Sequence, residues 1–313
     1  MLRTGRGKAH AKLILFGEHA VVHGEPAVAL PLAELPVRVT AEAVPGPLTI
    51  ASTPYTGVLH EVPELLDAPR AVVLATLDHV GLPHEGIRIM VEGDVPPARG
   101  LGSSAAVAGA LVRALADLAG RDLTEAEYLD LVAVGERVAH GSPSGLDAAA
   151  TAAAEPVWFE AGGARRLATR MSGVLVVADS GVKGRTRHAV ASVRTFLERR
   201  PMRGAALMTG LGALAQGGAL DLTGGRPEAL GEKMTQAQGM LRELGVSSPE
   251  LDRLVDAALA AGALGAKLTG GGQGGCIIVL AADDAAADRI DLALREAGAI
   301  GTWRHRIGPE EDR

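Results

Sequence analysis

Hydrophobic and polar positions along the chain follow two periods, and the period changes from segment to segment. Residues 36–44, PVRVTAEAV, alternate at every second position, which is typical of a strand with one buried face. Shorter apolar runs predict more deeply buried strands. Together, the alternating segment and the apolar runs predict strands at 12–16, 26–33, 36–44, 87–93, 173–179, 275–280 and 299–306.

Between these runs, apolar residues recur at spacings of three and four, which predicts helices. Thr124 and Glu127 form a capping box, and the Ser248-Pro249-Glu250 sequence is a good helix start. The stretch 45–62 is marked by Pro and Gly and is expected to hold a hairpin or an irregular loop. The predicted helices are 68–80, 104–119, 125–139, 145–154, 186–199, 204–216, 227–244, 249–261 and 284–296.

The pattern restarts after Gly162 and Gly163, which places a soft domain boundary near 160–170. A length of 313 residues allows two domains with a large core. We therefore expect a mixed α+β protein with domains 1–165 and 166–313. Only 2% of residues are aromatic, so the core must be built from Ala, Val and Leu.

Charge and cysteine content narrow the functional classes. The net charge of −6 and the absence of a basic run give no footprint for nucleic acid or a membrane surface. A single cysteine, Cys276, excludes an internal disulfide and fits a reducing compartment. We see no secretory signal and no run of about 18 apolar residues, so a cytoplasmic protein is expected. Arg greatly outnumbers Lys, so each remaining Lys can mark a position that needs a compact ammonium. Codon bias is the alternative explanation. The five lysines are Lys8, Lys12, Lys183, Lys233 and Lys267.

The segment PPARGLGSSAA, 96–106, lies between a predicted strand and a predicted helix. Ser103 or Ser104 is placed to cap that helix, and free backbone N–H groups with the helix dipole would favour a phosphate there. The segment lacks the Lys of a Walker A loop. Gly100 to Ala105 does match a dinucleotide fingerprint, but it is not in the first βα unit, and Asp122 follows a helix end instead of a second strand. A tight turn is the plain structural alternative.

Two further segments place polar residues among apolar ones. In KLILFGEHAVVHG, 12–24, the ammonium of Lys12 on an apolar strand needs an anion, and Glu18 and His19 follow at the strand end. Polar substrate contacts are the favoured interpretation. A structural pair is the alternative, and a zinc site with His19 and His23 lacks a third ligand.

In GERVAHGSPSGLDAAA, 135–150, Glu136 shares a helix face with Leu129 and Val132. An acid on an apolar stripe is costly unless it meets a cation such as Mg²⁺. Asp147 lies in the first turn of the next helix, where the dipole favours its carboxylate form. Such a carboxylate can accept a hydroxyl proton in a transition state, or it can simply stabilise the helix.

Two loops remain. KLTGGGQGG, 267–275, orders many glycines at an entropic cost, which favours close approach to a ligand or to another loop, with a flexible hinge as the alternative. The segment 179–190 carries Lys183, Arg185 and Arg187 from a strand into a helix. That loop suits an anionic ligand, although each charge taken alone fits solvated surface.

Taken together, these segments resemble the GHMP kinase superfamily, which has three motifs in this order. They correspond to 12–24, 96–105 and 267–275 and cover the chain nearly end to end. Within the superfamily, GEHAVVHGEPA, GERVAHGSPSGLD and GVSSPELDRL resemble the mevalonate kinases. The Glu-His-Thr-Asp sequence usual in galactokinase-like members is absent. Two departures, Ala148 after the motif Asp and Gln273 among the glycines, leave the fine substrate preference open.

The resemblance implies a two-domain GHMP kinase fold, with an N-terminal domain like ribosomal protein S5 domain 2 and a ferredoxin-like C-terminal domain. It implies ATP and Mg²⁺ as cofactors, mevalonate as a small-molecule substrate, and a possible homodimer. The implied catalytic residues are Asp147 as proton acceptor and Lys12 as its cationic partner. The remaining implied roles are ATP binding by Pro97, Gly100, Leu101, Gly102, Ser103, Ser104 and Ala105, magnesium binding by Ser104 and Glu136, and substrate binding by Glu18, His19, Ser144, Thr269 and Gly271.

Three alternatives stay open at this point. A kinase of the same fold could phosphorylate phosphomevalonate, homoserine or a sugar. A nucleotide sensor on the kinase fold would bind ATP without turnover, although Lys12, Ser104, Glu136 and Asp147 are all present. An NAD-dependent oxidoreductase is the third.

Overall fold

The structure, a computed structural model, describes residues 3–140, 145–161 and 163–308. These residues form two compact units, and each unit draws on separate stretches of the chain. Unit 1 takes its described residues from the ranges 1–11, 35–97 and 102–152. Unit 2 takes them from 12–34, 98–101 and 153–313.

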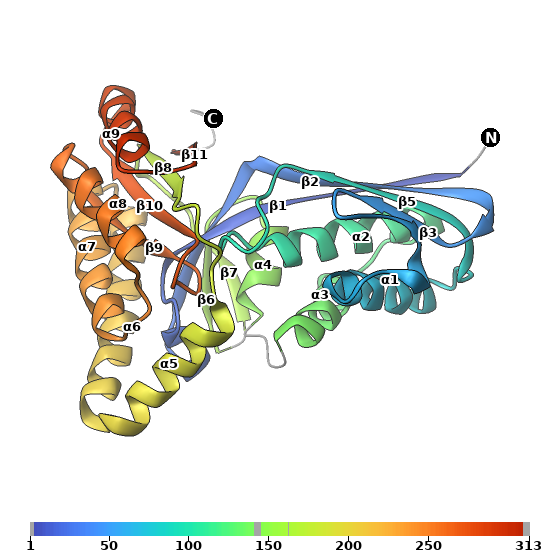
Figure 1. Cartoon of the computed structure of the whole chain (residues 1–313), viewed down its shortest axis with the longest axis horizontal. Helices are drawn as coiled ribbons and strands as arrows, with labels where there is room; N and C mark the ends of the chain where they lie inside the picture. Colours follow the sequence, from blue (N-terminus) through green and yellow to red (C-terminus); the bar gives the residue numbers. More distant parts are fainter. Residues whose placement is uncertain (1–2, 141–144, 162, 309–313) are drawn as a thin grey trace. The chain divides into compact units, whose positions relative to one another are not determined.

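Unit 1 places helices against an antiparallel and parallel set of strands in the order β4-β3-β5-β2 (Figure 1). Strand β1 also pairs with β2, and both strands continue into unit 2. The strands are β1 (Thr4–Phe16), β2 (Ala27–Pro47), β3 (Thr49–Ser52), β4 (Tyr55–Val58) and β5 (Glu85–Gly93). The helical segments are η2 (Leu59–Glu61), η3 (Glu64–Leu66), α1 (Asp67–Val80), α2 (Ser103–Ala119), α3 (Glu125–His140) and α4 (Leu146–Ala152).

Helices α1, α2 and α3 pack against one another, and their apolar faces form the core of unit 1 with the strands. The core consists almost entirely of Ala, Val, Leu and Ile side chains, with Tyr128 as its aromatic member. This confirms the expectation drawn from the low aromatic content. Helix α2 comes so close to β1 that a Cβ atom on Gly7 would lie 2.0 Å from the carbonyl oxygen of Ala110. The bare glycine backbone of β1 therefore sets where α2 lies.

Unit 2 contains an antiparallel sheet in the order β11-β8-β10-β9. The order in which its strands and helices follow along the chain is that of a ferredoxin-like domain, as the family resemblance implied. Helices α7 and α8 contact β9, while α9 packs on β8 (Figure 1). The sheet strands are β8 (Gly173–Asp179), β9 (Gly265–Thr269), β10 (Cys276–Ala281) and β11 (Gly301–Ile307).

The other elements of unit 2 are helices and a hairpin. The hairpin strand β6 pairs with the beginning of β2. The hairpin is formed by β6 (Val157–Glu160) and β7 (Gly163–Arg166). The helices are η1 (Ala20–His23), α5 (Thr186–Arg199), α6 (Pro201–Gly224), α7 (Pro227–Glu243), α8 (Pro249–Ala260) and α9 (Asp284–Glu296).

Most predicted elements are confirmed, including the capping box, in which Thr124 N–H donates to Glu127 at 2.8 Å. Ser248 caps α8 by accepting from Leu251 N–H. The predicted strands 26–33 and 36–44 are one strand, β2, and the predicted helix 204–216 is the middle of α6. Strand β9 and the β6–β7 hairpin were not predicted, because their runs are only four or five residues long and β9 and β7 carry basic residues.

The predicted serine cap on α2 is wrong. The helix begins at Ser103, so the N-cap is Gly102, which has a φ of 69° and no side chain to act as a cap. The left-handed turn at Gly102 brings the chain into the helix one residue before either serine could cap it. Among the described residues, no helix combines the length and the apolar composition needed to cross a membrane.

We expect Gly7→Ala to destabilise the protein by about 1–3 kcal/mol or more, because its methyl group would meet backbone atoms of α2 that cannot move cheaply. Gly239→Ala is the matched control. Gly239 lies in α7 with open space around the added carbon, so alanine should raise the free energy of unfolding by about 0.5–1 kcal/mol. Urea unfolding of both variants provides the test. Equal midpoints for Gly7→Ala and the wild type would contradict the packing of α2 on β1.

Candidate active site

Two glycine-containing loops of unit 2 touch through their backbones. A Cβ atom on Gly100 would lie 2.7 Å from the carbonyl oxygen of Thr269, and one on Gly270 would lie 2.7 Å from the Cα of Gly100. Gly100 and Gly270 also have φ values of 80° and 79°, in the left-handed region that favours glycine. The glycines of 267–275 therefore serve close approach to another loop, one of the two purposes that the sequence predicted.

Lys12 lies against the loop formed by residues 98–101, which we call the phosphate loop. Its side chain is 2% exposed, and its Nζ donates a hydrogen bond to the carbonyl oxygen of Gly100 at 3.2 Å. The backbone N–H of Lys12 donates to the carbonyl oxygen of Leu101 at 3.0 Å. A buried ammonium is thereby held beside the glycine turn that the sequence assigned to a phosphate.

The phosphate loop is anchored to the end of β8 by an ion pair. Arg99 Nε lies 2.8 Å from Asp179 Oδ2, and both side chains are largely buried. The carbonyl oxygen of Ala98 accepts from Gly184 N–H at 2.8 Å, which adds a backbone contact to the loop after β8. Sequence reasoning missed this anchor, because Arg99 is visible within the motif but nothing marks Asp179 as its partner.

A second ion pair, between Glu18 and Lys267, lies at the end of β1. Lys267 Nζ donates to Glu18 Oε1 and also to the carbonyl oxygen of Leu268, at 2.7 Å, and both side chains of the pair are fully buried. Burial raises the pKa of Glu18 and lowers the pKa of Lys267, while their mutual attraction opposes both shifts. The second oxygen of Glu18, Oε2, has no hydrogen-bond partner among the described residues. Lys267 was one of five lysines in the sequence, but only the fold pairs it with Glu18.

His19 is neutral and is fixed by the glycine-rich loop 270–275. Its Nε2 lies 3.0 Å from the carbonyl oxygen of Gly271, which can only accept a proton, so Nε2 carries the hydrogen and Nδ1 is left as an acceptor. Burial lowers the pKa of His19 from 6.5 to about 4. His19 has a φ of 62° and a ψ of −42°, and Ala20 N–H donates to the carbonyl oxygen of Glu18, so the chain makes a tight three-residue turn at His19 in a strained backbone conformation.

Thr269 joins strand β9 to strand β1. Its hydroxyl donates to the carbonyl oxygen of Ile14 at 3.0 Å and accepts from the N–H of Ile14 at 2.9 Å. The side chain is 1% exposed. The threonine hydroxyl thus pairs with the β1 backbone in the way that a neighbouring strand would, and this places the start of the glycine-rich loop beside the residues around Glu18.

The remaining predicted site residues lie in unit 1. Ser103 and Ser104 form the first turn of α2, with Ser104 exposed. Glu136 lies in α3 and is 5% exposed, as expected of an acid on the apolar face. Asp147 is half-buried in the first turn of α4, which confirms its predicted position in the helix. Ser144 lies outside the described residues.

Lys183 and Arg185 are exposed on the loop that runs from β8 to α5, and Arg187 is exposed in the first turn of α5. Arg185 N–H donates to the carbonyl oxygen of Gly272, so this basic loop also contacts the glycine-rich loop. The described residues contain no group of three or more His, Cys, Asp or Glu side chains arranged to hold a metal ion.

Unit 2 therefore gathers seven of the predicted site residues around contacting loops: Lys12, Glu18, His19, Gly100, Leu101, Thr269 and Gly271. They include a buried ammonium, loop backbone groups and a neutral histidine, and a few placed polar groups of this kind are typical of ligand sites. Two family models match this chain: "GHMP kinases N terminal domain" over residues 68–155 and "GHMP kinases C terminal" over residues 213–300.

Known proteins extend the likeness to the whole chain. A mevalonate kinase of Pyrococcus furiosus is 32% identical over 311 residues, covering 93% of this chain and 92% of that protein. One from Thermococcus gammatolerans is 35% identical, covering 87% and 88%. A crystal structure of L. major mevalonate kinase in complex with R-mevalonate superposes with a TM-score of 0.86 at 28% identity, over 99% of this chain and 97% of that one.

The chain belongs to the GHMP kinase family. It is accordingly an ATP-dependent kinase of a small molecule, and its α+β architecture is the two-domain fold of that family.

The lowered pKa of His19 predicts how stability depends on pH. Between pH 6.5 and about 4, His19 is protonated in the unfolded chain but stays neutral in the folded chain. The free energy of unfolding therefore falls as the pH is lowered through this window. From pH 7 to pH 5 the contribution of His19 is about 2 kcal/mol. His19→Asn, which removes the imidazole, should remove that part of the decrease in the free energy of unfolding measured by urea.

His60→Asn is the control for this measurement, because the His60 side chain is 79% exposed. It should show the same pH dependence as the wild type. An equal decrease in all three proteins would mean that His19 is not held in its neutral form.

Proposed function

We propose that this protein is a mevalonate kinase, which transfers the γ-phosphoryl group of ATP to the 5-hydroxyl of mevalonate. The observation that carries the proposal is the placement of Lys12 against the phosphate loop, next to the loop that holds His19 and close in sequence to Glu18. The identity of the acceptor is inferred from the relatives, because the mevalonate kinases compared above match about nine-tenths of this chain.

On this proposal, residues Pro97 to Ala105 bind the ATP phosphates. The amides of Gly100, Leu101 and Gly102 lead into the N-terminus of α2, where aligned peptide dipoles favour negative charge. Ser103 and Ser104 are not used as caps, which leaves their hydroxyls for the nucleotide and its metal. The anchor between Arg99 and Asp179 keeps the loop from adjusting when the phosphates enter.

Ser104 and Glu136 would hold Mg²⁺. Magnesium prefers hard oxygen donors, takes one or two from the protein, and fills its shell with phosphate oxygens and water. An exposed hydroxyl and a buried carboxylate fit that donor set. When bound, the ion neutralises charge on the β- and γ-phosphates.

Asp147 accepts the proton of the mevalonate 5-hydroxyl. The hydroxyl oxygen bonds to the γ-phosphorus, and the bond from the γ-phosphorus to the bridging β-phosphate oxygen breaks to release ADP. The transition state is loose, so catalysis comes chiefly from positioning and charge neutralisation. Lys12 supplies a desolvated positive charge for the transferring group. Glu18, His19, Ser144, Thr269 and Gly271 form the acceptor side, on which His19 Nδ1 and Glu18 Oε2 are acceptors for substrate hydroxyls.

A phosphorylated acceptor is the second candidate, and one observation favours it. Lys183 and Arg185 are exposed on the loop before α5, Arg187 is exposed in the first turn of that helix, and Arg185 contacts the glycine-rich loop through its backbone. Such a basic loop could bind a phosphate on the acceptor. Phosphomevalonate is then the alternative substrate.

A panel of acceptors separates these candidates. Purified protein with ATP and Mg²⁺ is offered mevalonate, phosphomevalonate, homoserine and galactose in turn, with ADP release and product mass as the readouts. We expect mevalonate to be phosphorylated with a kcat/KM at least about a hundredfold above the others, because an unmatched polar group in a built site typically costs that much. Turnover of phosphomevalonate alone would replace the proposal by the second candidate.

Asp147→Asn should lower kcat by about 10²–10³ or more while the affinity for ATP stays near the wild-type value, since the amide cannot accept the proton. Asp122→Asn, an exposed residue before α3, serves as the control and should leave kcat unchanged. Single-turnover phosphorylation and nucleotide binding are measured for both. Residual activity of Asp147→Asn within about tenfold of wild type would rule out the assigned role.

A further inference from the structure

Strand β9 ends the sheet order β11-β8-β10-β9, so its outer edge has no strand partner among the described residues. Backbone groups on such an edge need other partners. At Leu268 both groups find one: its N–H donates to Gln238 Oε1 at 2.9 Å, and its carbonyl oxygen accepts from Lys267 Nζ at 2.7 Å. Side chains therefore fix the strand just before the glycine-rich loop.

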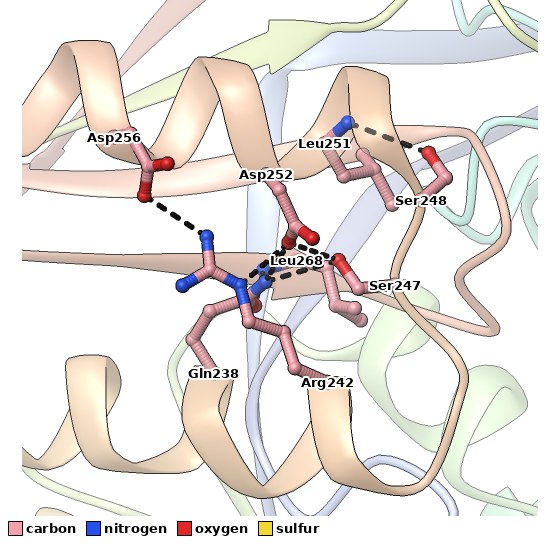
Figure 2. Close-up of polar contacts among 8 residues, drawn as sticks. All are labelled: Gln238, Arg242, Ser247, Ser248, Leu251, Asp252, Asp256 and Leu268. Carbon is pink, nitrogen blue, oxygen red and sulfur yellow. Dashed lines mark hydrogen bonds and ion pairs between the residues drawn. The ribbon is translucent and has the colours of Figure 1, made fainter.

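Gln238 connects this edge to helix α8 (Figure 2). The side chain, on α7, is 1% exposed, and its Nε2 donates to Ser247 Oγ and to Asp252 Oδ1, both at 3.1 Å. The amide oxygen faces an N–H and the amide nitrogen faces a carboxylate, so only one orientation of the amide satisfies both ends. Gln238 is a rigid link between Leu268 and Asp252.

Asp252 is the centre of the network. Besides Gln238, its Oδ1 accepts from Ser247 Oγ at 2.6 Å and from Arg242 Nε at 2.7 Å, as Figure 2 shows. Arg242 also donates to Asp256 Oδ1 at 2.9 Å, on the exposed side. One carboxylate thus joins α7, the turn 245–248 and the first turn of α8.

The turn 245–248 reaches the glycine-rich loop from its other end. The carbonyl oxygen of Val246 accepts from Gln273 N–H at 2.7 Å, and Gln273 Nε2 donates to Ser192 Oγ at 3.1 Å and to Gly245 O at 3.3 Å. A Cβ atom on Gly272 would lie 2.1 Å from Val246 O. The single non-glycine among these glycines is therefore the residue that ties the loop to the turn.

We propose that Gln238 and Asp252 are positioning residues that hold the glycine-rich loop for acceptor binding, Gln238 just before Gly270 and Asp252 through the turn that bonds Gln273. Gln238 fixes Leu268 between Lys267, which holds Glu18, and Thr269, which holds β1. Asp252 holds Ser247, next to the Val246 carbonyl that binds Gln273. This inference rests on the proposed function, because that function assigns Glu18, His19 and Gly271 to the acceptor. It also gives a role to the segment 245–254, which resembled the family without an assigned purpose.

The effect should fall on the acceptor and not on the nucleotide. The phosphate loop has anchors of its own, the Arg99–Asp179 ion pair and the bond from Gly184 N–H to Ala98 O, and neither involves the network. The acceptor side depends on the network at Leu268 and at Gln273, on either side of the Gly271 carbonyl that accepts from His19.

Gln238→Met keeps the shape of the side chain and removes both sets of hydrogen bonds. We expect it to raise the KM for mevalonate at least about tenfold, while the KM for ATP stays within about threefold. Asp252→Ala should likewise raise the KM for mevalonate and leave the KM for ATP nearly unchanged. Asp252→Asn should stay near wild type, since its amide oxygen can accept the same three bonds, and Asp256→Ala is the matched control outside the link to β9.

Amide hydrogen exchange tests the same link without activity. In Gln238→Met, the peptide 264–270, which carries the Leu268 N–H, should exchange at least about tenfold faster at that site. The peptide 174–179 from β8 should keep its protection. A uniform loss of protection would indicate general destabilisation and would overturn the positioning role.

The kinetic outcomes are equally decisive. A KM for mevalonate within about twofold of wild type in both Gln238→Met and Asp252→Ala overturns the proposal, as does an equal rise in both KM values. If the wild type does not phosphorylate mevalonate, the proposed function fails instead. Hydrogen exchange then still decides whether Gln238 fixes the loop.

Discussion

The backbone contact between Gly100 and Gly270 is the constraint on which the site in unit 2 depends. No side chain larger than hydrogen fits there, so the phosphate loop and the glycine-rich loop can lie directly against each other. That contact brings Lys12, bonded to one loop, near His19, bonded to the other. Positive φ values at both glycines show that the turns need glycine for their conformation as well as for space. The entropy lost in ordering so many glycines is offset by the anchors at Asp179, Gln238 and Val246.

Burial of charge gives the same site its chemical character. Lys12, Glu18 and Lys267 are all removed from water, so each must be satisfied by a neighbour, and removing one partner of such a pair is far more costly than the pair is stabilising. A site of this kind is held in one arrangement before any ligand enters. Low local dielectric also strengthens the field around the buried Lys12 ammonium. Neutral His19 adds an acceptor without adding charge.

The phosphate loop and the glycine-rich loop are held by different side-chain anchors, which suits phosphoryl transfer. The phosphate loop is tied to the end of β8 through Arg99, whereas the glycine-rich loop is tied to α7 and α8 through Gln238 and Asp252. Both loops also bond to the segment that follows β8, the phosphate loop through Gly184 and the glycine-rich loop through Ser180 and Arg185, and the glycine-rich loop has the α7–α8 network in addition. A reaction with a loose transition state gains most of its rate from such positioning. The network around Asp252 extends that positioning well beyond the residues that would touch a ligand.

The sequence by itself determined most elements, because hydrophobic period and capping are local properties; it also identified the two glycine loops, Lys12, the positions of Glu136 and Asp147 on their helices, and the family. It placed the α2 cap on a serine, since nothing local shows that Gly102 turns left-handed. Only the tertiary structure decided that Glu18 meets Lys267, that Arg99 meets Asp179 and that Gln238 closes the edge of β9. Such partners lie far apart along the chain, and their pairing is set by strand order and by burial, which no local pattern records.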